Sequence, residues 1–395
     1  MMKLNRYHSN WAKQIRKAMK LALLKSSLAV VAPLAVLLFH AQSLRAQGSL
    51  VPPGAPAPSM KSLSQIEART PVDATNTPGN STAQFNITQA GSYYLTGNIT
   101  GVNSKHGIVI QTNDVTLDLN GFEMTGISGS YDGIGVIPGA QNITIHNGTL
   151  RSWGIGVIAP GGNCELEHLR IYACTSQGID VGSSCTVRSC TTVSNGNIGI
   201  SFGNGGIVTA CLASSNSAAG ISGGSDCVMN ECLAIANNGD GIDLSNNFNI
   251  RQCTSDHNGG NGFTLGSAGS ISGCVANTNS DSGVEVDNTC TISECRANGN
   301  FISGFTSVGS EAVVVDNQAS FNTGFGIETF GSYNRIDGNY VVGNDVGIYS
   351  MAGPNVDVVV RNTSSGNGDN YSPSSGTTFA PVQTPSTATN SWANF

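Results

Sequence analysis

The chain has 395 residues, of which 39% are hydrophobic and only 11% are charged, and it contains 50 glycines. Eight of the 18 Lys and Arg residues lie in positions 1–46, where no acidic residue occurs. The remaining ten stand against 25 Asp and Glu and give residues 47–395 a net charge of −15. A chain with this charge repels nucleic acid and anionic lipid, which excludes both as partners of this part.

The first 46 residues have the order of a secretory signal peptide. Five basic residues between positions 13 and 25 precede an apolar run over 26–39, and small residues follow at Ala41, Ser43 and Ala46. This order predicts cleavage and a secreted, periplasmic or cell-surface location for the rest. An uncleaved anchor is the alternative, although the run is shorter than the ~20 residues of a bilayer span. No other segment is apolar enough to cross a membrane.

Two segments lie between the signal peptide and the centre of the chain. Residues 47–60 (QGSLVPPGAPAPSM) are rich in Pro and lack periodicity, which predicts a linker. Residues 61–106 are expected to form an N-terminal cap with a first strand over 92–100, and a stronger strand is predicted over 115–122.

Three residue types keep one 21-residue period through the centre of the chain. They are cysteines (Cys190, Cys211, Cys232, Cys253, Cys274, Cys295), asparagines five positions later (Asn195, Asn216, Asn237, Asn258, Asn279, Asn300) and glycines before an apolar residue (Gly178, Gly199, Gly220, Gly241, Gly262, Gly283, Gly304). Such a period indicates that each unit is one coil of a solenoid. Less regular units, opening at Gly107, Gly133, Gly154, Gly326 and Gly347, extend the count to about twelve coils.

Residues 241–261 (GIDLSNNFNIRQCTSDHNGGN) illustrate one coil. Ile242 and Leu244 alternate with Asp243, and Ile250 and Cys253 mark further inward positions on either side of an expected bend. Three short strands and three bends per unit predict an all-β fold, a right-handed parallel β-helix over 107–367 with a C-terminal tail or cap over 368–395. A leucine-rich repeat would need more leucine and a helical segment in each unit.

The two polar columns are interpreted as structural. Stacked asparagines can donate their amides to one another along the axis and satisfy buried polar atoms, so an asparagine ladder is expected. The stacked cysteines are expected to be buried free thiols, because coils ~4.8 Å apart hold their side chains too far apart for a regular disulfide. One or two pairs remain open to oxidation, Cys164 with Cys185 first among them.

These residues resemble the right-handed parallel β-helix repeat proteins of the pectate-lyase-like superfamily. Residues 91–122 (GSYYLTGNITGVNSKHGIVIQTNDVTLDLNGF) are similar to the first coils of exported bacterial members, and NSWANF (390–395) resembles the aromatic ends of some of them. The resemblance implies the fold but leaves activity open, because the superfamily includes lyases, hydrolases, epimerases and non-catalytic adhesins. The paired aspartates and Gly-His-Gly of its polygalacturonase-like hydrolases do not occur here, nor do the clustered aspartates of its calcium-dependent lyases.

One candidate site lies near the N-terminal end. Aligning VTLDLN, ITIHNG, CELEHL and CTVRSC places Asp118, His146, Glu167 and Arg188 on one outward position of successive coils. Two carboxylates could then hold His146 in a chosen tautomer while Arg188 binds a uronate carboxylate. The alternative is a cross-strand charge ladder that only stabilises the face.

A second candidate is the outward column that carries Asp180, Asp243, Glu285 and Glu328. Asp243 with Glu285, and Glu285 with Glu328, are two coils apart, or ~9–10 Å, near the upper end of the separation in inverting glycosidases. The solubility of an outward face explains these carboxylates equally well. No metal site and no cofactor is expected.

Three functions follow from these features. The first is an exported β-helix that presents a polar face for glycan binding or cell-surface interaction, with an extracellular or cell-wall polysaccharide as partner. The second is a polysaccharide lyase or epimerase that acts on uronate-containing glycans through the Asp118/His146/Glu167/Arg188 face. The third is a structural rod of the cell envelope.

Overall fold

The computed structural model describes residues 67–352, 356–373, 377–384, 386 and 389–395. The predicted signal peptide (1–46) and linker (47–60) lie outside these residues. Over the described part the chain forms strands, turns and bends, and it contains no helix long and apolar enough to cross a membrane.

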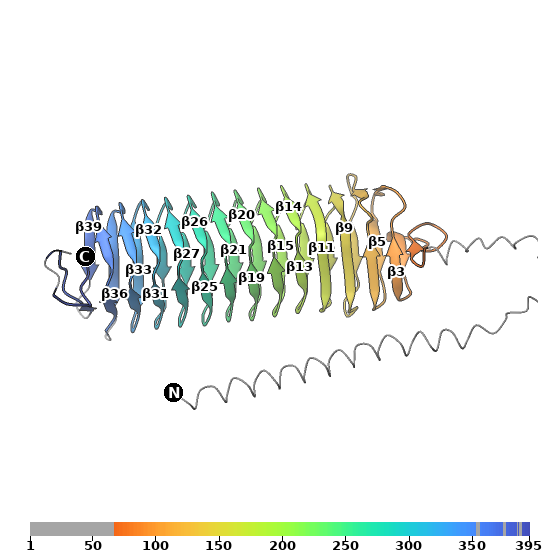
Figure 1. The fold of residues 1–395 in the computed structure, drawn as a ribbon. Coiled ribbons are helices and arrows are strands. Elements are labelled where there is room, and N and C mark those ends of the chain that lie inside the picture. The colour runs from red at the N-terminus through yellow and green to blue at the C-terminus, as the bar shows by residue number, and fades with distance from the viewer. Residues whose placement is uncertain (1–66, 353–355, 374–376, 385, 387–388) are drawn as a thin grey trace, which may run out of the picture. The chain divides into compact units, whose positions relative to one another are not determined.

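The strands form two parallel sheets, and within each sheet the strands of successive coils lie side by side along one axis (Figure 1). The first face of the solenoid is a 14-stranded sheet with one strand per coil. Its strands are β2 (Ala83–Ile87), β5 (His106–Ile110), β8 (Ile134–Val136), β10 (Val157–Ala159), β12 (Ile179–Val181), β15 (Ile200–Phe202), β18 (Ile221–Gly223), β21 (Ile242–Leu244), β24 (Phe263–Leu265), β27 (Val284–Val286), β30 (Phe305–Ser307), β33 (Phe325–Gly331), β36 (Val346–Ala352) and β39 (Asp369–Pro373).

The 26-stranded sheet provides the other two faces, which are joined because β9 and β11 run through the bend between them. The second face contains β1 (Thr70–Pro71), β3 (Gly91–Tyr94), β6 (Val115–Asp118), β13 (Thr186–Arg188), β16 (Ile207–Thr209), β19 (Val228–Asn230), β22 (Asn249–Arg251), β25 (Ser270–Ser272), β28 (Thr291–Ser293), β31 (Val313–Val315), β34 (Arg335–Asp337), β37 (Val358–Val360) and β40 (Thr378–Phe379). The third contains β4 (Ile99–Thr100), β7 (Glu123–Thr125), β14 (Thr191–Val193), β17 (Leu212–Ser214), β20 (Leu233–Ile235), β23 (Thr254–Asp256), β26 (Val275–Asn277), β29 (Arg296–Asn298), β32 (Gln318–Ser320), β35 (Tyr340–Val342) and β38 (Thr363–Ser365). Strands β9 (Ile143–Arg151) and β11 (Cys164–Tyr172) belong to both.

The predicted parallel β-helix is confirmed, with about 14 coils where about twelve were expected. The two added coils are those of β2 and β39, at the ends. The periodic glycine is replaced there, since the positions that match Gly107 and Gly347 on the neighbouring strands are Gln84 and Asn370. A count based on that glycine therefore stops one coil short at each end.

The inward side chains form one continuous apolar core. Ile242, Ile250 and Cys253 are fully buried, as the alternation in 241–261 predicts. The column of cysteines is buried and every cysteine is a free thiol, Cys164 and Cys185 included. The backbone N–H of a cysteine can donate to the cysteine sulfur of the next coil, as Cys253 N–H donates to Cys274 Sγ at 3.3 Å. The thiols thus act as small apolar packing units.

The asparagine ladder is confirmed atom by atom. The side-chain amide of Asn237 donates to Asn258 Oδ1 at 3.0 Å, and that of Asn258 donates to Asn279 Oδ1 at 3.0 Å. From Asn216 onward each buried ladder amide also reaches a backbone carbonyl, as Asn258 Nδ2 reaches Ala234 O at 3.1 Å. Because these hydrogen bonds satisfy the buried amide groups of successive coils, polar side chains can occupy the interior at a fixed period.

Each central coil turns at left-handed residues, and many of these are not glycine. In the coil 241–261 they are Asn247, Gln252 and His257, with φ of 59°, 52° and 55°. Their backbone N–H groups donate to carbonyl oxygens of the next coil, namely Ser267 O, Ser272 O and Asn277 O, at 2.9–3.1 Å. A left-handed residue with a side chain costs roughly 1–2 kcal/mol. The hydrogen bonds made at these bends offset that cost and keep the coils in register.

The cysteine column continues as a second asparagine column, Asn317, Asn339 and Asn362, which begins where Cys295 N–H donates to Asn317 Oδ1 at 2.8 Å. The segment at the C-terminal end closes this column. Asn362 N–H donates to Asn394 Oδ1 at 2.9 Å, and Asn394 Nδ2 donates to Val359 O at 3.0 Å. Phe395 N–H donates to Asn362 O at 2.8 Å, and the Tyr371 hydroxyl donates to Phe395 O at 2.9 Å. Asn394 and Phe395 therefore supply partners to the last coil that another coil would otherwise provide.

Candidate functional site

The four N-terminal candidate residues occupy one column of the second face. Asp118 on β6 pairs with His146 on β9, His146 with Glu167 on β11, and Glu167 with Arg188 on β13. The alignment of the four sequence segments therefore predicted the register correctly.

The side-chain contacts of this column differ from the expected bracketing of His146. Its Nδ1 lies 3.8 Å from Asp118 Oδ1. The Glu167 carboxylate instead lies 3.6 Å from Nδ1 of the adjacent His168, and Arg188 lies 3.7 Å from Glu165. One carboxylate, not two, contacts His146. The reason is that Glu167 contacts His168 on its own strand, and Arg188 contacts Glu165 on the neighbouring strand.

Arg69 is a component of this face that the repeat could not predict. Its Nη1 lies 2.6 Å from Asp118 Oδ2, and its Nε lies 2.9 Å from Glu67 Oε1. The guanidinium also stacks on the ring of Tyr94, 4.7 Å from its centroid. Hydrogen bonds from Arg69 lower the pKa of Glu67 to about 2. Asp118 thus forms an ion pair with Arg69, a residue that precedes the repeat. This ion pair limits the freedom of Asp118 to act on His146.

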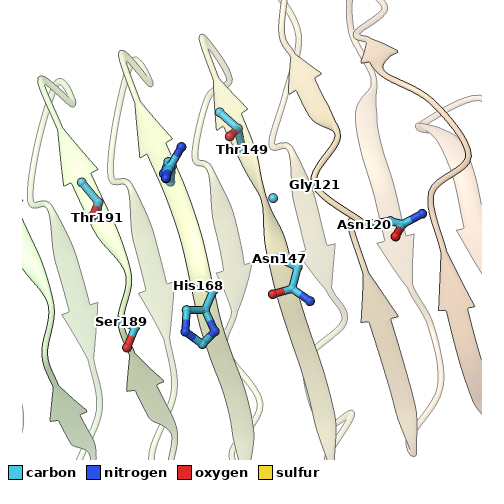
Figure 2. Close-up of a pocket in the computed structure, with 9 residues that line it drawn as sticks. Asn120, Gly121, Asn147, Thr149, His168, Ser189 and Thr191 are labelled. Atoms are coloured by element: carbon cyan, nitrogen blue, oxygen red, sulfur yellow. The ribbon is translucent and has the colours of Figure 1, made fainter.

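A polar cleft lies immediately beside this column, where β9 and β11 bend from the second face to the third. Its volume is about 590 Å³. It is lined by Asn120, Gly121, Asn147, Gly148, Thr149, His168, Arg170, Ser189 and Thr191. We call it the bend cleft. Figure 2 shows Asn147, His168 and Ser189 on three neighbouring coils, with Thr149 further along the strand of Asn147 and Thr191 further along the coil of Ser189.

Left-handed backbone shapes the bend cleft. Asn147, His168 and Ser189 have φ of 61°, 53° and 52°, so equivalent bends stack over three coils. Each of these residues directly follows a residue of the predicted column, on β9, β11 and β13 respectively. The predicted column and the bend cleft are therefore adjoining parts of one surface.

Arg170 is an unpaired cation in the bend cleft. Its strand neighbours are Thr149 and Thr191, and its side chain forms no hydrogen bond or ion pair within the described residues. The nearby Glu123 is bound by Arg151, whose hydrogen bond lowers the pKa of that carboxyl. Arg170 therefore keeps an uncompensated positive charge on a chain that is otherwise acidic.

The second set of candidates also forms one column, on the first face. Strand pairing runs from Asp180 through Ser201 and Ser222 to Asp243, and from there through Thr264, Glu285 and Thr306 to Glu328. The two-coil separation of Glu285 from Glu328 is as predicted.

These four carboxylates are less exposed than an outward, solubilising column requires. Glu328 is 8% exposed and the other three are half-buried. Side chains at the adjacent turn contact two of them: Asn261 Nδ2 reaches Glu285 Oε2 at 3.4 Å, and Ser303 Oγ donates to Glu328 Oε2 at 3.1 Å. Burial raises the pKa of all four carboxyl groups. The solubility interpretation is therefore wrong for Glu328.

Metal binding has no support in the described part of the chain, where no group of three or more His, Cys, Asp or Glu is placed to hold an ion.

Comparison with known proteins agrees with this architecture. Residues 153–293 match the family described as the right-handed beta helix region. No curated protein matches the chain by sequence.

Solved structures that share the fold include the following two. The A-module of mannuronan C-5 epimerase AlgE6 from Azotobacter vinelandii has a TM-score of 0.53 and 16% identity, and the match covers 74% of this chain and 92% of that one. The Agl-KA catalytic domain has a TM-score of 0.50 and 13% identity, over 64% of this chain and 57% of that one. At these identities the likeness concerns the fold alone. Together with the match of residues 153–293 to the right-handed beta helix region, it supports a right-handed parallel β-helix fold for this chain.

Proposed function

We propose that the protein is exported and binds an acidic polysaccharide in the bend cleft. The observation that carries this proposal is Arg170, an exposed guanidinium without a partner in a polar cleft of about 590 Å³. A guanidinium grips a carboxylate through two parallel hydrogen bonds, which suits a uronate.

The other lining groups fit sugar hydroxyls. Asn147 provides an amide, Thr149 and Thr191 provide hydroxyls, and His168 provides an imidazole. Because residues 47–395 carry a net charge of −15, a polyanion would be repelled unless it met a local positive site. The structural neighbour named as a mannuronan epimerase acts, by its name, on a polysaccharide, which supports this class of ligand.

Calorimetric titration with oligomers of alginate and of polygalacturonate tests this proposal. Arg170→Gln should weaken binding about tenfold or more, since a hydrogen bond to a charged group contributes ~1.5–3 kcal/mol. Arg296→Gln is the matched control, because Arg296 lies on the same column six coils further on and does not line the bend cleft. Equal losses in the two variants, or none in either, would contradict the proposal.

Turnover of the bound glycan is the second candidate function. Its support is the position of His146 beside Asp118, whose Oδ1 lies 3.8 Å from His146 Nδ1 on the neighbouring coil, because a histidine near a carboxylate is a common arrangement for proton transfer. A lyase would release an unsaturated product that absorbs in the ultraviolet, and an epimerase would change the proton spectrum of the uronate.

His146→Ala should abolish such turnover and leave the thermal melt nearly unchanged. His257→Ala is the control, because His257 also lies beside a carboxylate, 2.9 Å from Asp256, but on a central coil. An inactive wild-type protein that still binds the glycan would leave binding as the function, and an inactive protein without binding would favour the structural rod.

A further inference from the structure

A second hollow lies at the bend after the third face, on coils near the C-terminal half of the solenoid. Its volume is about 440 Å³, and it is lined by Thr278, Asn279, Ser280, Gly299, Phe301 and Thr323. Strand pairing places its coils about six coils from the bend cleft, or roughly 30 Å along the axis. We call it the aromatic hollow.

Phe301 forms the apolar part of the aromatic hollow. Its side chain is 66% exposed although it is a large hydrophobic group. Its backbone is fixed, because its N–H donates to Asn279 O at 3.0 Å and the preceding Asn300 is held in the ladder by Asn322 at 2.9 Å. An exposed ring on a rigid backbone is already positioned for a ligand, so little conformational entropy is lost on binding.

The next coil carries a second exposed ring in a strained position. Phe321 is 66% exposed and has φ of 54°. The equivalent bend residues on the neighbouring coils are Gly299 and Gly343, and a bulky residue is uncommon in this conformation. Two adjacent coils therefore present phenyl rings to solvent at a bend where other coils carry small or polar residues.

The polar groups of the aromatic hollow are neutral, and two are free. The hydroxyls of Ser280 and Thr323 form no hydrogen bond within the described residues, whereas the amide of Asn279 is used by the ladder. Thr278 donates to Asp256 Oδ1 at 2.8 Å. The lining contains no Lys or Arg that could neutralise a uronate.

We propose that the aromatic hollow is a second binding site, which takes a neutral pyranose ring. One face of such a ring is made of C–H groups that can stack on Phe301, and its edge carries hydroxyls that can pair with Ser280 and Thr323. The two sites differ in charge, so this inference does not rest on the proposed function of the bend cleft.

Calorimetric titration of the full chain with cellohexaose, laminarihexaose and mannohexaose tests the proposal. At least one hexasaccharide should bind the wild type, and Phe301→Ala should weaken that binding about tenfold. Phe301→Trp should retain it, because the flat aromatic face remains. Tyr333→Ala is the matched control, an exposed aromatic at a different bend that does not line the aromatic hollow.

Each outcome decides the proposal. No binding of any of the three hexasaccharides to the wild type, or equal affinity in Phe301→Ala, overturns it. Sedimentation velocity tests the alternative occupant, a second copy of the chain. If the wild type dimerises and Phe301→Ala is monomeric, the Phe301 ring contacts that second copy and the proposal is wrong. Arg170→Gln should leave hexasaccharide binding unchanged, which separates a failure here from a failure at the bend cleft.

Discussion

The coils that form the bend cleft and the coils that follow them share one backbone but use their side chains differently. The central coils fill the interior with repeated thiols and amides, such as Cys232 and Asn237. The earlier coils use larger apolar groups at the matching places, such as Leu169 and Trp153, and carry ion pairs on the outside. The interior of the central coils is therefore repetitive, whereas the bend cleft and its unpaired Arg170 lie on coils where the repeat is interrupted.

Removing one central amide should have the largest effect. Asn258→Ala leaves both the N–H and the side-chain amide of Asn237 without the Oδ1 acceptor of residue 258, and removes the side-chain donor to Ala234 O. We expect the free energy of unfolding to fall by about 3 kcal/mol or more, since each buried unsatisfied group costs ~1–3 kcal/mol. Denaturant titration measures this loss.

The neighbouring Asn238 is exposed and its side chain forms no hydrogen bond within the described residues. Asn238→Ala should change stability by no more than ~0.5 kcal/mol. A similar loss in both variants would show that the ladder does not set the stability of the central coils.

The C-terminal cap should come next. Asn394→Ala removes the acceptor of Asn362 N–H and the donors to Val359 O and Ala380 O, with an expected local loss of ~2 kcal/mol. Hydrogen exchange should accelerate at Asn362 and Ser364 and stay unchanged in the coil of Asn258. Uniform acceleration along the chain would mean that the solenoid unfolds as one unit instead of opening from its end.

A left-handed bend should tolerate glycine better than alanine. Ala236 has φ of 54°, so Ala236→Gly should raise stability by up to ~1 kcal/mol once the greater freedom of the unfolded chain is included. Ala234→Gly, two residues earlier in β20 and fully buried, should instead destabilise the protein. Thermal melts of the two variants should therefore shift in opposite directions.

The smallest effect should be a dependence on pH at Glu328. Burial raises the pKa of its carboxyl group in the folded chain, so the folded state retains the proton to a higher pH than the unfolded state. Stability contributed by this group is therefore present at low pH and is lost as pH rises through the folded pKa. Glu328→Gln should raise the melting temperature at pH 7, and this gain should vanish at pH 4. A gain that persists at pH 4 would have another cause.

The period predicted most of the architecture because equivalent residues of stacked coils must lie over one another. It placed Asp118, His146, Glu167 and Arg188 on one column without any structural information, and it predicted the inward thiols. The period could not predict the partner of Asp118, because that partner, Arg69, precedes the repeat in the sequence and contacts Asp118 only in the folded chain. The end coils were missed because they lack the periodic glycine.

The bend cleft was missed for a different reason. Its shape comes from left-handed residues, and on successive coils these are Asn147, His168, Ser189, Ala210 and Glu231. No residue preference marks such a bend, because hydrogen bonding between coils imposes the conformation. Arg170 was likewise inconspicuous in sequence, since only the paired strands show that threonines flank it.

Hydrogen exchange with and without alginate oligomers tests most directly whether recognition resides in the N-terminal coils. Binding in the bend cleft should slow exchange in peptides that contain Asn147, His168 and Ser189, and leave peptides from the central coils around Asn237 unchanged. Protection spread evenly along the solenoid, or confined to the central coils, would contradict uronate binding in the bend cleft.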